Sequence, residues 1–358
     1  MPLDPTAARV EREFRHPSPL LGCRFDPSGR FLFATAQDNS IQRFDLVTGA
    51  RTPLVGHSSW GRGMAVRPAG PRTVDVDLAA TRIAARAGAI GPAAVAAPAP
   101  PADPFTLVSA DYHGKLIWWN GDAAAPTPVR TVEAHTGWCR AVTLSPDGTT
   151  LATCGNDNLV KLWDATTGAP RRTLTGHTSH VYNVAFHPSG TRLVSADLLG
   201  TVKDWDITTG ACVRDLDAKV MHKYDPTFRA DIGGARGMAI AADGRVACAG
   251  ITNVSNAFAG VGNPLVVLFD WSDGKSKALK PKDAFQGTAW GVGFLNDGTV
   301  VAAGGGSGGR VWFWPGAETT STHTLTVTAH VRDLAIHPAG DRFGVATATG
   351  AVVYTLRK

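Results

Sequence analysis

The chain has 358 residues and a formal net charge of +5. It contains no apolar run of about 18 residues, so we expect no membrane-spanning helix. The N-terminus lacks a basic stretch followed by an apolar one, which argues against a secretory signal and predicts a cytoplasmic protein. The charge is too small and too dispersed to indicate nucleic-acid binding by itself.

The first predicted element is a short strand at residues 9–16, RVEREFRH, which precedes a series of repeats. Each repeat contains a turn rich in Pro, Asp and Gly between two apolar segments, a composition typical of hairpins between antiparallel strands. The turns end at Gly29, Gly70, Gly148, Gly190, Gly244, Gly298 and Gly340. The shortest spacings, 41 and 42 residues, match a four-stranded propeller blade of about 40–45 residues.

The second half of each unit reads as a strand, a polar turn and a strand that ends in an aromatic residue, as in LATCGNDNLVKLWDATTG. These features, with the motifs TGH, SPDG and LWD, resemble the WD-repeat family, in a bacterial-type form, over nearly the whole chain. The unit LTGHTSHVYNVAFHPSGTRLVSADLLGTVKDWDITTG is the most specific match. The resemblance implies an all-β fold, a β-propeller of four-stranded antiparallel blades formed by residues 1–358 as a single domain. The seven turns predict a seven-bladed β-propeller.

The last unit ends one strand short, with AVVYTLRK at the C-terminus. Residues 9–16 have the form of the missing fourth strand, including a closing histidine, His16. We therefore expect the N-terminal strand to complete the last blade and close the ring, which leaves no open sheet edge between the first and last blades.

The resemblance also implies a structural tetrad of His, Ser or Thr, Asp and Trp within a blade. The third unit has all members: His135, Thr153, Asp157 and Trp163. The fourth has His177, Ser195 and Trp205 with Leu199 in the acid's place, the second has His57, Ser109 and Trp119 with His113 there, and the first has His16, Asp38 and Phe44. A buried histidine needs a partner for each ring nitrogen, so we interpret these residues as structural and expect no metal, cofactor or catalytic role.

Three segments depart from the repeat. Residues 71–104 form an Ala/Pro-rich insertion between the first two strands of the second blade, and TRIAARAGAI within it could form a short helix. Residues 216–233 extend the fourth unit and residues 251–264 enlarge the fifth. Long loops on a rigid scaffold often carry function, but tolerated insertions explain them equally well.

Two positions of the first strand of each blade carry a different pattern. Eight residues before the turn glycine stand Leu21, Arg62, Arg140, Tyr182, Arg236, Trp290 and Arg332, and ten before it Trp60, Trp138, His180 and His330 recur among smaller residues. If the strands are equivalent, these columns form two rings at one mouth of the channel. Arginine and aromatic residues dominate binding hot spots and suit carboxylate or phosphate capture.

This pattern predicts a partner-binding site made of Trp60, Arg62, Trp138, Arg140, His180, Tyr182, Arg236, Trp290 and Arg332. One alternative stays open, because position eight shares its strand parity with the apolar columns. Its aromatic residues would then cap the core between blades, and Asp111, Asp197 and Asp333 would neutralise the arginines.

The favoured hypothesis is a monomeric, non-enzymatic protein–protein interaction scaffold whose partner is a peptide or protein, an acidic one among the options. The alternative is a propeller enzyme, a hydrolase or lyase acting on a small anionic substrate in the channel, with Asp111, His113 and Asp197 as its candidate groups. Binding of nucleic acid by the same arginines is a weaker third hypothesis.

Overall fold

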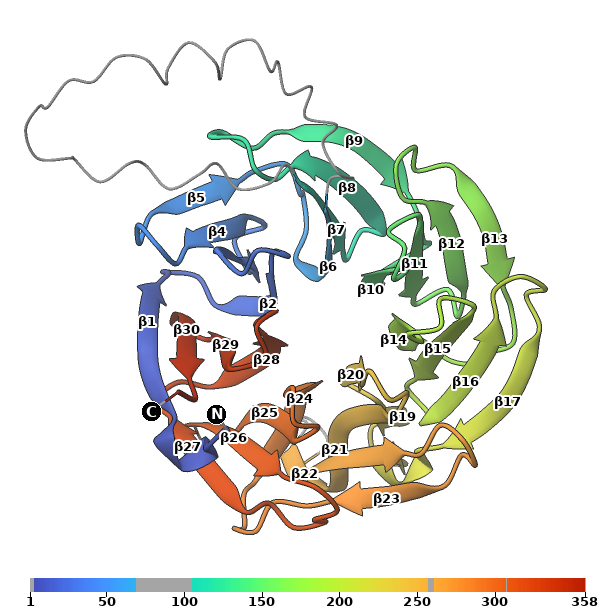
Figure 1. The fold of residues 1–358 in the computed structure, drawn as a ribbon. Helices are drawn as coiled ribbons and strands as arrows, with labels where there is room; N and C mark the ends of the chain where they lie inside the picture. The colour runs from blue at the N-terminus through green and yellow to red at the C-terminus, as the bar shows by residue number, and fades with distance from the viewer. Residues whose placement is uncertain (1–2, 69–104, 257–260, 307, 358) are drawn as a thin grey trace, which may run out of the picture.

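The computed structural model describes residues 3–68, 105–256, 261–306 and 308–357. Within them the chain forms antiparallel sheets arranged as seven blades in a ring (Figure 1). The predicted all-β propeller of four-stranded blades is confirmed. The predicted insertion at 71–104 lies outside the described residues.

Each blade runs outward from a first strand beside the axis to a fourth strand on the rim (Figure 1). Blade 1 contains β2 (Leu20–Phe25), β3 (Phe31–Ala36), β4 (Ile41–Asp45) and β5 (Arg51–Leu54). Blade 2 contains β6 (Gly61–Pro68), β7 (Phe105–Asp111), β8 (Lys115–Asn120) and β9 (Pro128–Glu133). Blade 3 contains β10 (Cys139–Leu144), β11 (Thr150–Gly155), β12 (Val160–Asp164) and β13 (Pro170–Leu174). Blade 4 contains β14 (Val181–Phe186), β15 (Arg192–Asp197), β16 (Thr201–Asp206) and β17 (Cys212–Asp217).

The remaining three blades have the same order. Blade 5 contains β20 (Gly237–Ile240), β21 (Val246–Asn256), β22 (Val261–Phe269) and β23 (Ser276–Leu279). Blade 6 contains β24 (Gly287–Phe294), β25 (Val300–Gly306), β26 (Gly308–Trp314) and β27 (His323–Val327). Blade 7 contains β28 (Val331–Ile336), β29 (Arg342–Thr347), β30 (Gly350–Thr355) and β1 (Arg9–Arg15). One ladder pair, Gly262 with Gly287, joins the sheets of blades 5 and 6, and an isolated bridge joins Lys280 to Thr320.

The ring is closed by the N-terminal strand, as the sequence predicts. β1 pairs antiparallel with β30, from Arg9 opposite Thr355 to Arg15 opposite Gly350. Phe14 is buried and stacks on Phe44 of blade 1, with ring centroids 4.7 Å apart. The strand therefore completes blade 7 and also packs against its neighbour.

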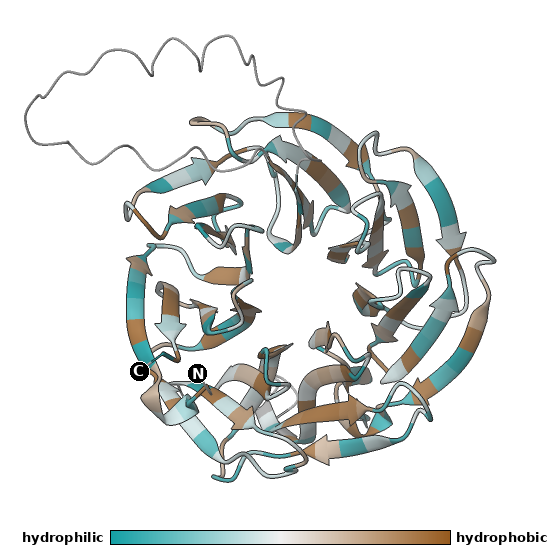
Figure 2. Cartoon of the chain, viewed as in Figure 1, coloured by the Kyte–Doolittle hydropathy of each residue, from teal (hydrophilic) through white to brown (hydrophobic). Residues whose placement is uncertain are grey.

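Packing between blades explains the apolar pattern of the inner strands. β3 and β11 are buried along their whole length, whereas β9 on the rim is mostly exposed. Figure 2 shows the same trend, with hydrophilic residues frequent on rim strands such as β1 and β17. A strand covered on both faces reads as a continuous apolar run rather than an alternating one.

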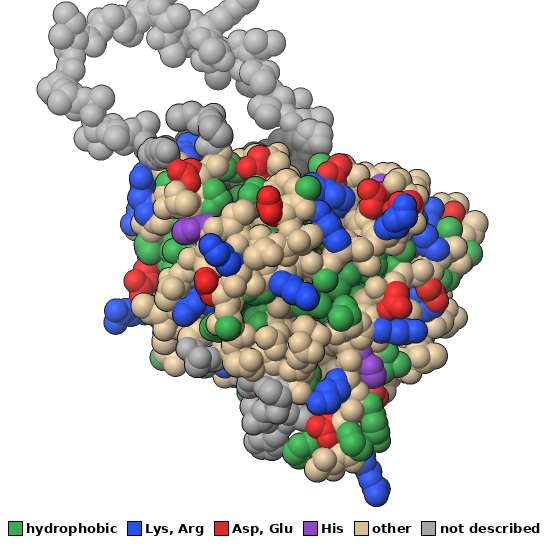
Figure 3. Space-filling view, turned by 90° about the horizontal axis from the view of Figure 1, so that it is seen from below, with side chains coloured by type: hydrophobic (Ala, Val, Ile, Leu, Met, Phe, Trp, Pro, Cys, Tyr) green, Lys and Arg blue, Asp and Glu red, His purple; other side chains and the backbone are tan. Residues whose placement is uncertain are grey.

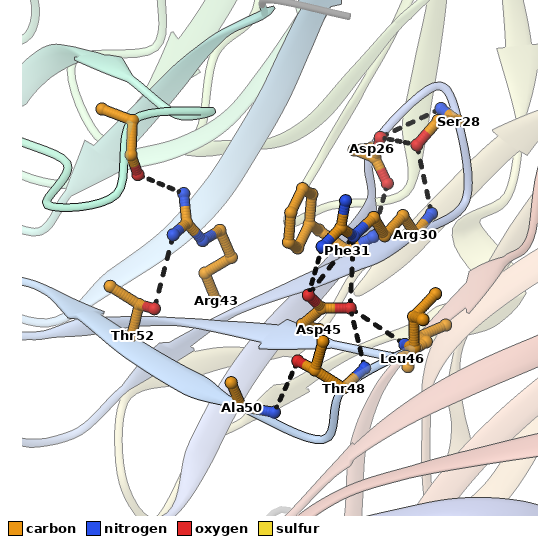
Figure 4. Close-up of polar contacts among 12 residues, drawn as sticks. Asp26, Ser28, Arg30, Phe31, Arg43, Asp45, Leu46, Thr48, Ala50 and Thr52 are labelled. Atoms are coloured by element: carbon orange, nitrogen blue, oxygen red, sulfur yellow. Dashed lines mark hydrogen bonds and ion pairs between the residues drawn. The ribbon is translucent and has the colours of Figure 1, made fainter. Parts of the chain in front are cut away.

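The turn between the third and fourth strands is held by the acid that follows the aromatic residue. In blade 1, Asp45 Oδ1 accepts the Val47 amide at 2.9 Å, and Asp45 Oδ2 accepts Arg30 Nη2 at 2.8 Å (Figure 4). Burial raises the pKa of Asp45, but the bonds from Arg30 and the turn amides outweigh it and lower that pKa to about 2. Asp164 and Asp206 accept equivalent turn amides in blades 3 and 4, so this acid has a structural role.

Small residues line the first strands because neighbouring blades meet closely near the axis. A Cβ atom added to Gly291 of β24 would lie 2.4 Å from the Leu334 amide nitrogen of β28. One added to Gly63 would lie 2.8 Å from the Val142 amide nitrogen. Contacts under 3.0 Å with backbone atoms require the strands to move apart.

Two extensions form hairpins. Residues after β17 make a short 3-10 helix, η4 (Lys219–Met221), and a hairpin of β18 (His222–Asp225) and β19 (Ala230–Gly233). β21 and β22 continue their pairing beyond the blade to Asn256 and Val261. Among the described residues, no helix is long and apolar enough to cross a membrane.

Candidate functional site

The tetrad of blade 3 has the expected geometry. His135 Nδ1 lies 2.8 Å from Asp157 Oδ1, and His135 Nε2 lies 2.8 Å from Thr153 Oγ1. Trp163 Nε1 donates to the same hydroxyl at 2.9 Å. The chain of contacts ties the histidine loop to the second and third strands of the blade.

The predicted substitution of the tetrad acid in blades 2 and 4 is wrong. His57 Nδ1 lies 2.9 Å from Asp111 Oδ2, and His177 Nδ1 lies 2.9 Å from Asp197 Oδ2. These acids stand at the ends of β7 and β15, two residues before His113 and Leu199. The acid is expected in the turn after the second strand because Asp157 of blade 3 lies there. In blades 2 and 4, a carboxylate at the end of the second strand lies within hydrogen-bond distance of the histidine.

The other members of these two tetrads are in place. His57 Nε2 lies 2.6 Å from Ser109 Oγ, which accepts Trp119 Nε1 at 2.8 Å. In blade 4, Ser195 Oγ has the same two contacts, with His177 Nε2 at 2.7 Å and Trp205 Nε1 at 2.7 Å. The motif SAD, shared by both blades, was the sequence signal for the acid.

The groups nominated for an enzyme are therefore engaged elsewhere. Asp111 is buried, and its Oδ1 accepts the backbone amides of His113 and Lys115 at 3.0 Å each. Burial raises the pKa of Asp111, but the bonds from His57 and these amides outweigh it, and the net pKa is lowered. The His113 side chain contacts Ser58, with Nδ1 3.2 Å from Oγ. Asp111 and His113 thus do not form an acid–imidazole couple.

Blade 1 has a reduced version of the tetrad. His16 uses Nε2 rather than Nδ1 to contact Asp38, at 2.8 Å. Phe44 replaces the tryptophan and stacks on Phe14. His16 stands directly after the closing strand, so this contact also ties blade 7 to blade 1.

The residues of position eight, except Arg236 just before β20, share one backbone feature, a β-bulge at the start of the first strand. In β10, the register shifts between Cys139 and Ala141, on either side of Arg140. Equivalent shifts occur at Leu21, Arg62, Tyr182, Trp290 and Arg332. A bulge re-aims a side chain, which explains how residues with the same sequence parity as the apolar columns can face the mouth.

These side chains meet as an alternating series of cations and rings. The Arg140 guanidinium carbon lies 4.3 Å from the ring centroid of Trp138 and 4.4 Å from that of Tyr182. The Arg236 carbon lies 4.7 Å from Tyr182 and 5.5 Å from Trp290. We call this set, with Arg62, the arginine–aromatic mouth.

Arg62 crosses the channel to join this set. Its guanidinium carbon lies 5.3 Å from the Trp290 ring of blade 6, and its Nη2 donates to the Arg236 carbonyl of blade 5 at 3.3 Å. The chain positions of these residues are far apart, and the closed ring brings them together.

Tyr112 belongs to the same surface and was not predicted. It follows the tetrad acid Asp111, and its ring stacks on Trp138 with centroids 4.0 Å apart and planes 1° from parallel. The ring centroids of Trp60 and Tyr112 are 6.5 Å apart. Trp60 is 44% exposed and Trp138 is 40% exposed, so these three rings offer an aromatic surface to solvent.

The remaining predicted residues lie in less central places. His180 Nδ1 lies 2.8 Å from the Asn156 carbonyl oxygen, and Asn156 Oδ1 accepts Arg140 Nε at 2.8 Å. Leu21 is buried and adds no polar group. Arg332 carries its charge close enough to Arg62 for repulsion to lower the pKa of Arg332, after the larger effect of burial.

Positive charge at the mouth is not neutralised within the described residues, where Arg62, Arg140, Arg236 and Arg332 form no ion pair. The three acids considered as their partners bind other groups. Asp111 and Asp197 contact histidines, and Asp333 Oδ2 accepts the Cys23 amide at 3.0 Å and lies 3.4 Å from Arg24 Nη1.

The pKa values of the half-buried arginines respond to this crowding. The pKa values of Arg140 and Arg236 are both lowered, mainly by burial and further by the charge of neighbouring arginines. On the side of the molecule shown in Figure 3, by contrast, charges of both signs are interspersed.

Two adjoining cavities in the channel are lined by described residues. The one beneath the arginine–aromatic mouth has a volume of about 260 Å³, and Arg62, Arg140 and Arg236 contribute to its wall. The other, towards the hairpin turns, has a volume of about 810 Å³ and shares Arg24 and Met238 with the first. Among the described residues, no group of three or more His, Cys, Asp or Glu side chains is placed to hold a metal ion.

Comparison with known proteins agrees with the geometry of the blades. The family model "WD domain, G-beta repeat" matches residues 9–45, 126–164 and 168–206. The nuclear distribution protein PAC1 of Arthroderma otae is 43% identical over 58 residues, which are 16% of this chain and 12% of that protein. The chain therefore matches only about an eighth of the length of this relative.

Proposed function

We propose a scaffold role for this chain, which belongs to the WD-repeat family. WD-repeat proteins generally serve as platforms for protein partners. We assign the partner site to the arginine–aromatic mouth, where a peptide or protein with acidic groups would bind, and we place this activity in a cytoplasmic monomer.

One observation carries the proposal: uncompensated arginines lie beside exposed aromatic rings on a rigid ring of strands. Trp60 and Trp138 together with Tyr112 provide large, rigid apolar contacts. Arg140 is held between two rings, so little side-chain entropy is lost when it binds a carboxylate. Aromatic and arginine anchors of this kind supply most of the binding energy in protein interfaces.

A hydrolase or lyase is less well supported, because its nominated groups have structural contacts. Asp111 and Asp197 bind tetrad histidines. Among the described residues, no other group of side chains is favoured as a catalytic site. We therefore propose the interaction scaffold rather than an enzyme.

The test is partner capture by the folded protein and by two matched triple variants. The mouth variant combines Arg62→Ala, Arg140→Ala and Trp138→Ala, and the control combines Arg15→Ala, Arg172→Ala and Tyr224→Ala on exposed surfaces elsewhere. A partner retained by the wild type and the control but lost by the mouth variant is the expected result. Equal retention by all three proteins, with similar melting temperatures, would move the partner site to another surface.

A further inference from the structure

The inner wall of the mouth has donors without acceptors. Arg236 Nε and Trp290 Nε1 are buried, and neither has a hydrogen-bond partner among the described residues. The Trp290 ring lies within contact distance of both Arg62 and Arg236, at 5.3 and 5.5 Å. Burying a donor without an acceptor is unfavourable, and more so for a charged group, so an acceptor placed at these atoms would stabilise the site.

Because Arg140 and Arg236 stack on aromatic rings, they can bind a ligand only through N–H groups in the planes of their guanidinium groups. The aromatic rings cover the faces of the Arg140 and Arg236 guanidinium groups. The N–H groups of a guanidinium lie in its plane, and its fork of donors matches two oxygens of a carboxylate or phosphate. The rings thus orient the arginines. Arg140 Nε donates to Asn156 Oδ1, and the other in-plane N–H groups of Arg140 and Arg236 remain available to an oxyanion.

The cavity beneath the mouth has suitable size and charge. Its volume of about 260 Å³ exceeds the about 30 Å³ that one water occupies in the liquid. Arg62, Arg140 and Arg236 reach its wall, and its one carboxylate, Asp333, is paired with Arg24 and the Cys23 amide. Positive charge therefore prevails on the side nearest the mouth.

We propose that the channel beneath the mouth binds one oxyanion between Arg62, Arg140 and Arg236. The ligand is either a free phosphate-type anion or a carboxylate inserted by a partner, and this second source rests on the proposed scaffold function. A free anion has a route through the larger cavity at the opposite end of the channel, which adjoins this one at Arg24 and Met238.

The experiment uses two probes on the full chain at constant ionic strength. Inorganic phosphate is titrated by calorimetry and by thermal melting, with chloride as the reference. A fluorescent hexaglutamate peptide is titrated by anisotropy, with hexaglutamine as the reference, and phosphate is then added as a competitor.

The variants are Arg236→Gln, Arg62→Gln and the control Arg15→Gln, whose side chain is 90% exposed. Arg62→Gln serves as the second test if Arg236→Gln melts at a much lower temperature. Loss of one charge-assisted pair should weaken binding about tenfold or more, and Arg15→Gln should bind as the wild type does.

Saturable phosphate binding that depends on Arg236 and Arg62 identifies a free oxyanion. Binding of hexaglutamate alone, with the same dependence, identifies a carboxylate from a partner. Failure of both probes, or equal binding by all variants, overturns the oxyanion site. Partner capture that depends on the mouth while both probes fail would leave the scaffold standing, and phosphate binding without any partner would leave the oxyanion site alone.

Discussion

The assignment of Asp111, rather than His113, to the blade 2 tetrad predicts a sharp contrast between two substitutions. A carboxylate only accepts hydrogen bonds, so His57 Nδ1 must carry the proton that Asp111 accepts. His57 Nε2 then accepts the hydroxyl proton of Ser109, whose oxygen in turn accepts Trp119 Nε1. The proton positions along the whole tetrad are thus set by the carboxylate.

Asp111→Asn reverses this order. The backbone amides of His113 and Lys115 need the one side-chain oxygen of Asn as acceptor, so its NH2 group faces His57 Nδ1. The imidazole must then move its proton to Nε2. Ser109 Oγ then receives two donors, and its own hydroxyl proton loses its acceptor. Bonds to a charged group contribute about 1.5–3 kcal/mol and a buried unsatisfied group costs about 1–3 kcal/mol, so we expect a loss of about 3 kcal/mol in the free energy of unfolding.

The measurement is urea unfolding followed by tryptophan fluorescence, together with calorimetric melting. With about 2.1 cal/mol/K of unfolding entropy per residue and 358 residues, about 3 kcal/mol lowers Tm by about 4 °C. His113→Ala should change stability by less than about 0.5 kcal/mol, as exposed substitutions do. Asp215→Asn, which removes an exposed carboxylate paired with Lys203, is a control worth about 0–1 kcal/mol.

The reasoning is refuted if Asp111→Asn is as mild as Asp215→Asn, or if His113→Ala is the more damaging change. Either result would mean that Asp111 does not complete the tetrad in solution. Asp111 would then again be a candidate catalytic residue for the hydrolase or lyase hypothesis.

Further predictions concern closure, crowding and pH. Phe14→Ala should cost about 3 kcal/mol in chemical denaturation, since a buried aromatic ring leaves a cavity, and no loss would show that the N-terminal strand is dispensable. Gly291→Ala should destabilise by about 1–3 kcal/mol through overpacking against Leu334; an unchanged midpoint would show that the strands can separate. The folded pKa values of Asp111 and Asp157 are lowered, so their contribution is complete above the unfolded pKa of about 4 and is lost as pH falls through the folded values. Tm should therefore drop below about pH 4, and a drop of the same size in Asp111→Asn would contradict the role of that carboxylate.

The repeated turns and apolar strands were sufficient to predict the number of blades and the closing strand. Hairpin turns and strand periodicity are local properties, because they depend on residues a few positions apart. The terminal strand could be placed because the last unit lacked one strand and only residues 9–16 had the right form. The meeting of arginines and aromatic residues at one mouth also followed from the equivalence of the blades.

Tertiary structure decided which acid completes the tetrads of blades 2 and 4 and where each arginine is directed. Asp111 and Asp157 reach their histidines from a strand end and from a turn, and this depends on the path of the backbone rather than on sequence spacing. Arg62 finds its contacts on blades 5 and 6, and Tyr112 joins the mouth through Trp138 of another blade. Contacts across a closed ring depend on bulges and blade positions together, which no single repeat encodes.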